Sequence, residues 1–126
     1  MIEQLNIKFD AAKLNPEEYD IYRHLKRGRN NAVSVSSLSS LTGMADVVIR
    51  KIIRHLIMEH NMLIASNVHQ PPGFFVPETA DELHIATRSL RHRGIMILMR
   101  AAKLHKISIV EIFNQTIMDF KETLNL

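Results

Sequence analysis

Residues 32–56 read AVSVSSLSSLTGMADVVIRKIIRHL, and this segment holds two helical patterns separated by a break. Residues 32–33 suit a short extended piece, after which the hydroxyl of Ser34 can cap a short helix. The side chains that this helix is expected to turn inward are Leu38 and Leu41. Residues 42–44 contain Gly43 and should end the helix, because glycine favours a turn. The segment therefore predicts two helices joined by a tight turn.

The second helical pattern, residues 46–59, has two chemically different faces. The apolar positions with the i, i+3, i+4, i+7 spacing of one buried face are Ile49, Ile52, Ile53 and Leu56. The nearly opposite stripe consists of Val47, Arg50, Lys51 and Arg54. One side of this helix is expected in the core, and the other should present positive charge.

Two short apolar runs rich in strand formers follow, at residues 62–65 and 73–76. The connection at residues 67–72 is too long for a two-residue turn, so the pair is expected to form a β-hairpin with a longer tip. His69 and Gln70 lie in this tip. For His69, contact with a nucleic-acid groove or phosphate and an ordinary loop histidine both stay open.

The helix expected before this segment begins at Asn15-Pro16-Glu17-Glu18. Asparagine can cap a helix, proline suits its first position, and the two acids meet the positive end of the helix dipole. We expect this helix to extend to about Lys26. Its apolar period consists of Tyr19, Tyr22 or Arg23, and Leu25.

Two capping boxes, at residues 79–82 and 108–111, predict a long helix and a terminal helix after the hairpin. Residues 95–99 are apolar at successive positions, so this part of the long helix has no ordinary solvent face. The terminal helix or a second subunit is expected to cover it. The apolar positions of the terminal helix are Val110, Phe113, Ile117, Phe120 and Leu124. The predicted homodimer interface consists of Ile95, Met96, Met99, Phe113, Ile117 and Phe120.

The composition is that of a single small globular domain. The chain has 126 residues, of which 46% are hydrophobic and 23% charged, and its formal net charge is +3. Residues 81–106 are strongly basic, whereas residues 107–126 are acidic on balance. Cysteine is absent, which excludes disulfides and thiolate metal sites. No membrane span or signal peptide is expected, so we predict a cytoplasmic location.

Sequence motifs for catalysis, metal binding and cofactor binding are absent. The chain has no glycine-rich phosphate loop, no nucleophile elbow and no paired carboxylates in a catalytic context. His55 and His60 are five residues apart, and no His-x-x-x-His or Glu-x-x-His pair occurs. We therefore expect neither an enzyme nor a cofactor or metal site.

Residues 32–44 followed by 49–56 resemble the helix-turn-helix of small bacterial and bacteriophage winged-helix DNA-binding proteins. Residues 73–83 and 88–93 are similar to the wing exit and basic helix of phage-type members. The resemblance covers residues 15–106. It implies a mainly α fold with a small β-hairpin wing, divided into an N-terminal arm (1–14), a winged helix-turn-helix (15–78) and a helical dimerisation extension (79–126). Ala45 departs from the Ser or Thr usual at the start of the reading helix.

Two functions follow as hypotheses. The first is a double-stranded DNA-binding protein, a transcription regulator or a phage-type replication or packaging factor, whose helix 46–59 reads the major groove. Its predicted DNA-binding residues are Val47, Arg50, Lys51, Arg54, Ser34, Ser36, His69 and Gln70. The second is a non-enzymatic adaptor that binds a partner protein through Val47 and Val48.

Overall fold

The computed structural model describes residues 9–125, so most of the predicted N-terminal arm lies outside the described residues. The described chain is mainly helical and has one two-stranded antiparallel sheet, as the sequence predicts. It divides into two compact units between Thr87 and Arg88, inside the long helix α5 (Ala80–His105). The boundary predicted from the sequence, residues 78–79, lies at the start of that helix. Each unit is described by itself below.

The first unit begins with a short 3-10 helix, η1 (Ala11–Lys13), followed by α2 (Pro16–Tyr22). The predicted cap of α2 is present: Glu18 N donates to Asn15 Oδ1 at 2.8 Å, and Asn15 N donates to Glu18 Oε1 at 2.9 Å. The predicted end at Lys26 is wrong. Lys26 lies outside the helix because its carbonyl oxygen accepts a 2.8 Å hydrogen bond from Val76 N, near the hairpin.

The apolar period predicted for α2 is confirmed in part: Tyr22 and, just after the helix, Leu25 pack against the core, but Tyr19 does not. Ile21 is fully buried, whereas the side chain of Tyr19 is 47% exposed. The aromatic ring of Tyr19 packs at the surface against Tyr22, with 5.8 Å between the ring centroids. Ile21, which the predicted period leaves out, is the fully buried apolar side chain of this helix.

The helix-turn-helix region follows a second 3-10 turn, η2 (Arg29–Asn31), and forms α3 (Val35–Thr42) and α4 (Asp46–Met58). Ser34 caps α3 as predicted, since its Oγ accepts a 3.0 Å bond from Ser37 N. Gly43 ends α3 with φ 75°, in the left-handed region. Leu38 is buried, but the prediction for Leu41 is wrong, because this side chain is 56% exposed on the last turn of α3.

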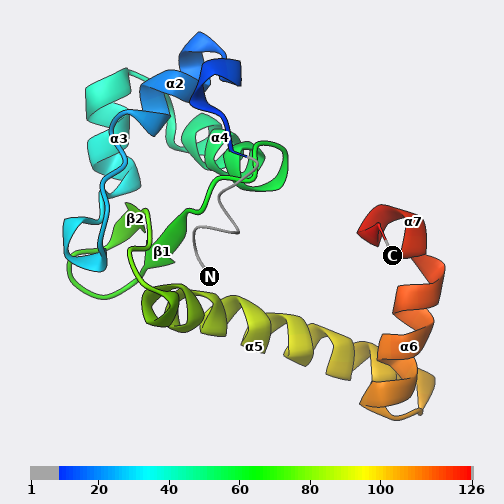
Figure 1. Cartoon of the computed structure of the whole chain (residues 1–126). Coiled ribbons are helices and arrows are strands. Elements are labelled where there is room, and N and C mark those ends of the chain that lie inside the picture. Colours follow the sequence, from blue (N-terminus) through cyan, green and yellow to red (C-terminus); the bar gives the residue numbers. More distant parts are fainter. Residues whose placement is uncertain (1–8, 126) are drawn as a thin grey trace. The chain divides into compact units, whose positions relative to one another are not determined.

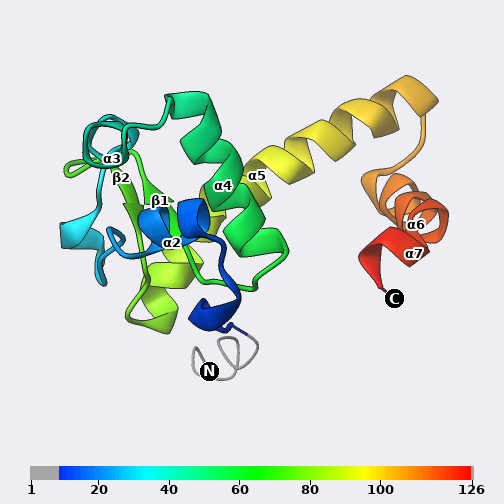
Figure 2. The ribbon, with the colours of Figure 1, turned by 90° about the horizontal axis from the view of Figure 1, so that it is seen from above.

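The two-faced pattern predicted for α4 is confirmed on its apolar side. Ile49, Ile53 and Leu56 are buried, and Ile52 is partly buried against the same core. The helix begins without a side-chain cap, because Ala45 holds the capping position. Figures 1 and 2 show α2, α3 and α4 grouped together in the first unit.

The hairpin consists of β1 (Ala65–Asn67) and β2 (Gly73–Phe75), paired antiparallel with Ala65 opposite Phe75. Val33 adds a single bridge on the other side of β2, and its N and O exchange 2.8 Å bonds with Phe74. The first strand starts later than predicted. Met62 is instead buried in the helical core, and its N–H donates to Leu56 O at the end of α4.

The second unit contains most of α5, then α6 (Ile109–Asp119) and α7 (Lys121–Leu124). The predicted N-terminal caps are present, at Thr79 for α5 and at Ser108 for α6. Among the described residues of this unit, only Ala102 and Ile112 are buried. The apolar positions of the terminal helix at Val110, Phe113, Phe120 and Leu124 are all exposed within this single chain.

Within residues 9–125, no helix combines the length and the apolar character needed to cross a bilayer. The long helix α5 spans 26 residues, and the apolar run at residues 95–99 lies between Arg93 and Arg100.

Candidate functional site

The outer face of α4 carries the positive stripe predicted from the sequence. Val47, Arg50, Lys51 and Arg54 are all exposed, and Val47 is 78% exposed. Within the described part of the chain, none of the three cations forms an ion pair with a carboxylate. Their charges are therefore available to an external anion.

The other predicted DNA-binding residues lie on α3 and on the hairpin tip. Ser36 is exposed on the first turn of α3. Ser34 is partly buried, and its hydroxyl caps α3 while donating a 3.0 Å bond to Ser37 Oγ. The hydroxyl of Ser34 is therefore engaged inside the protein.

The tip of the hairpin presents His69 and Gln70, both exposed. Asn67 organises this tip by bonding across it: its Oδ1 accepts from His69 N at 3.2 Å, and its Nδ2 donates to Pro71 O at 3.0 Å. The side chains of His69 and Gln70 thus project from a loop that the two hydrogen bonds of Asn67 hold in place.

The residues predicted for a dimer interface all belong to the second unit. Ile95, Met96, Phe113 and Phe120 are exposed, and Met99 and Ile117 are partly buried. Of the two expected covers for the apolar band of α5, the terminal helix does not bury Ile95, Met96 or Ile97, and cover by a second subunit stays a prediction. These side chains stay uncovered within this chain.

An open hollow of about 710 Å³ lies between α2 and α4 on the first unit. Val48 and Met58 give it an apolar wall, and Lys51 and Arg54 border it from the basic stripe. Glu17 and Glu59 supply acidic groups at its edge. The stripe on α4 therefore adjoins a recess with mixed charge.

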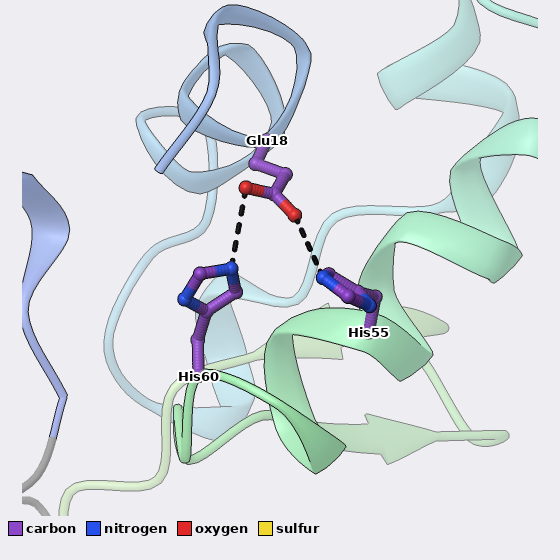
Figure 3. Close-up of side chains that lie close together, drawn as sticks. All are labelled: Glu18, His55 and His60. Atoms are coloured by element: carbon purple, nitrogen blue, oxygen red, sulfur yellow. Dashed lines mark ion pairs between the residues drawn. The ribbon is translucent and has the colours of Figure 1, made fainter. Parts of the chain in front are cut away.

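A cluster of three side chains from separate segments lies near the C-terminal end of α4, whereas Val47 lies near its N-terminal end (Figure 3). Glu18 of α2 points between His55 of α4 and His60 of the loop after α4. Its Oε2 lies 3.2 Å from His55 Nε2, and its Oε1 lies 3.3 Å from His60 Nε2. The imidazole rings meet edge to face, with 5.2 Å between centroids.

The environment of Glu18 favours its ionised form. The residue is only 5% exposed, and burial alone would raise the pKa of its carboxyl group. The hydrogen bond from Asn15 N outweighs burial, and together with His60 and His55 it holds the pKa of Glu18 below its usual range. We therefore describe Glu18 as a buried carboxylate anion with three partners.

Sequence spacing gave no indication of this cluster. His55 and His60 are separated by the end of α4, and Glu18 is far from both along the chain. The one available signal was the capping box, which fixes the direction of the Glu18 side chain without revealing what faces it.

Comparison of the chain with protein-family models, with curated proteins and with solved structures gives no match.

Proposed function

We propose that this protein binds double-stranded DNA through a winged helix-turn-helix. The observation that carries the proposal is the exposed stripe of Arg50, Lys51 and Arg54, which forms no ion pair with any residue between 9 and 125. These cations lie on the second helix of a helix, glycine turn, helix unit, which is the helix that enters the major groove in such proteins.

The order of elements supports the same proposal. Helix α2, the single bridge at Val33, helices α3 and α4, and the hairpin of β1 and β2 follow one another as in a winged helix. In this interpretation the segment between the strands is the wing, and its His69 and Gln70 contact the DNA backbone. A role on bacterial or phage DNA would place the protein in the cytoplasm.

The proposed contacts are of two kinds: some recognise DNA bases, and others bind the phosphate backbone and position the protein. Arginine can donate two hydrogen bonds to guanine O6 and N7, so Arg50 and Arg54 are the proposed base readers. Lys51, with Ser36 at the first turn of α3, would contact phosphates, and Val47 would meet a thymine methyl group. Ser34 contributes by capping α3, since its hydroxyl is already engaged.

The second unit would complete the proposed protein as a homodimer. A two-fold pair places two reading helices about 34 Å apart, which matches one turn of DNA. The exposed apolar side chains of α5 and α6 supply a surface that a second copy would cover. Whether the protein acts as a transcription regulator or in phage replication follows from its target sequence, not from this geometry.

Selection of bound duplexes from a random pool, followed by affinity measurements on the selected duplex, tests the proposal. We expect Arg50→Ala with Arg54→Ala to weaken binding about 30-fold or more, because each lost base contact costs about 1–3 kcal/mol. Lys13→Ala with Lys121→Ala removes the same charge from exposed positions elsewhere and should leave most of the affinity. If no motif is enriched, or if both double variants bind equally, the proposal is wrong.

A protein-binding adaptor is the second candidate, and the exposure of Val47 and Val48 at the start of α4 favours it. Salt dependence separates the two functions. DNA binding through several phosphates should weaken steeply between about 50 and 200 mM salt, whereas an apolar protein interface should barely respond.

A further inference from the structure

We propose that Glu18, His55 and His60 form a binding site for a divalent transition-metal ion of the Zn²⁺ type. This site is separate from the proposed DNA contacts, and the proposed function does not require it. Each side chain offers one ligand atom, and these three atoms lie within 4.8 Å of one another. They come from α2, from α4 and from the loop after α4, so an ion bound here would connect separate segments of the first unit (Figure 3).

The distances suit a tetrahedral ion. With metal–ligand bonds of about 2.0–2.1 Å, neighbouring ligand atoms of a tetrahedral Zn²⁺ site lie about 3.3 Å apart. His55 Nε2 lies 3.2 Å from Glu18 Oε2, and His60 Nε2 lies 3.3 Å from the other oxygen, Oε1. One ligand atom from each of the three residues lies within 4.8 Å of the other two, so a modest adjustment would bring the set to this spacing. A small rotation of the carboxyl group would let Oε2 coordinate the ion while Oε1 keeps its 2.9 Å bond from Asn15 N.

That bond from Asn15 orients the carboxylate before any ion arrives. Hydrogen bonds to ligating groups fix their direction and raise metal affinity. Here the orienting group is the backbone of a helix cap, so the carboxylate is held by the fold itself. The side chain of Glu18 is also buried, which limits its freedom to turn away.

The donor set decides the class of ion. Two imidazole nitrogens and one carboxylate suit Zn²⁺ and related transition metals, whereas Mg²⁺ and Ca²⁺ prefer oxygen donors throughout. The side chain of His55 is half exposed and borders the hollow between α2 and α4. The ion could therefore enter from solvent, and water could fill the fourth position.

An ion in this position would stabilise the folded first unit. It would join α2 to the end of α4, and a ligand that binds only the folded state raises stability by mass action. The same three side chains also satisfy one another as carboxylate–imidazole pairs, so a purely structural cluster is the competing interpretation.

Calorimetric titration and thermal unfolding of the full chain, stripped of metal with a chelator, test the proposal. We expect one Zn²⁺ per chain and a Tm higher by several degrees, with no response to Mg²⁺. His60→Gln and His55→Gln should each weaken Zn²⁺ binding about tenfold or more. His105→Gln, at an exposed histidine on the last turn of α5, is the matched control and should bind as the original chain does.

Using two histidine variants keeps the test decisive if one of them folds poorly. Co²⁺ gives a further readout, because its visible absorption reports tetrahedral coordination by histidine and should disappear in both variants. Failure to bind Zn²⁺, or equal binding by His60→Gln and His105→Gln, would overturn the site. DNA affinity measured in the presence of a chelator does not depend on whether Zn²⁺ binds. The DNA-binding proposal and the Zn²⁺-site proposal can therefore be refuted independently.

Discussion

At the scale of single residues, Glu18 shows how a buried charge is accommodated. A carboxylate without partners would be strongly destabilising in the core. Glu18 instead receives a backbone hydrogen bond from Asn15 and faces the imidazoles of His55 and His60. One side chain therefore caps α2 and also connects it to α4 and to the loop that follows.

We predict that Glu18→Gln lowers the free energy of unfolding by about 1.5–3 kcal/mol in metal-free buffer, because hydrogen bonds to a charged group are lost. The Gln oxygen can still accept from Asn15 N, so the loss reports mainly on the histidine contacts. Urea denaturation measures the difference. Glu17→Gln, an exposed neighbour on the same turn, is the control and should change stability by about 0.5 kcal/mol or less. Equal effects of the two changes would contradict the role given to Glu18.

Glycine supplies a second prediction at this scale. Gly73 has φ 128°, and a Cβ there would overlap the backbone of Val33. Gly73→Ala should therefore destabilise the protein by at least about 2 kcal/mol. A Cβ at Gly94 in α5 meets nothing within 4 Å, so Gly94→Ala should instead stabilise the helix by about 0.5–1 kcal/mol. Thermal unfolding of both variants checks the opposite signs.

At the scale of elements, the two helices of the helix-turn-helix begin with unequal caps. Ser34 bonds to the first turn of α3, while Ala45 gives α4 no side-chain bond although its backbone is extended as a cap requires. The N-terminus of α4, the helix proposed to read DNA, is therefore less stabilised by capping than the N-terminus of α3. This feature was visible in the sequence, and the structure confirms it.

We predict that Ala45→Ser raises the free energy of unfolding by about 1 kcal/mol, because a serine hydroxyl can accept from the first turn of α4. Ser34→Ala should lower it by a similar amount, since it removes an existing cap. Chemical denaturation measures both changes. A loss of stability in Ala45→Ser would show that another constraint shapes this turn.

At the scale of the whole molecule, the second unit buries little of its own apolar surface. Ala102 and Ile112 are its only buried described residues, while large side chains on both α5 and α6 are exposed. Surfaces of this kind mark association sites in soluble proteins. The homodimer predicted from the sequence therefore stays a prediction. The exposed apolar side chains of α5 and α6 are the surface through which it would form.

We predict that the chain sediments as a dimer at micromolar concentration and that Phe113→Glu shifts it to the monomer, because a charge would be buried in the interface. Asn114→Glu places the same charge at the neighbouring exposed position and should leave the dimer largely intact. Analytical ultracentrifugation separates the cases. A monomer at every concentration for the original chain would remove the dimer from the proposed function.

The sequence by itself determined the local features of this protein. The caps at Asn15, Ser34 and Ser108, the glycine that ends α3, and the two faces of α4 all follow from residues within a few positions of one another. Helix caps and helix faces depend on short-range hydrogen bonds and on a fixed period, so the amino-acid order is sufficient to predict them.

Only the tertiary structure decided which apolar residues are buried and which polar side chains contact one another. Leu41 and Val110 lie on helices that were predicted correctly, yet they are exposed because no side chain among residues 9–125 packs over them. Glu18, His55 and His60 meet because α2 packs against α4, a contact between distant segments. Burial and long-range contact depend on what lies opposite a side chain in space, and that information is absent from local spacing.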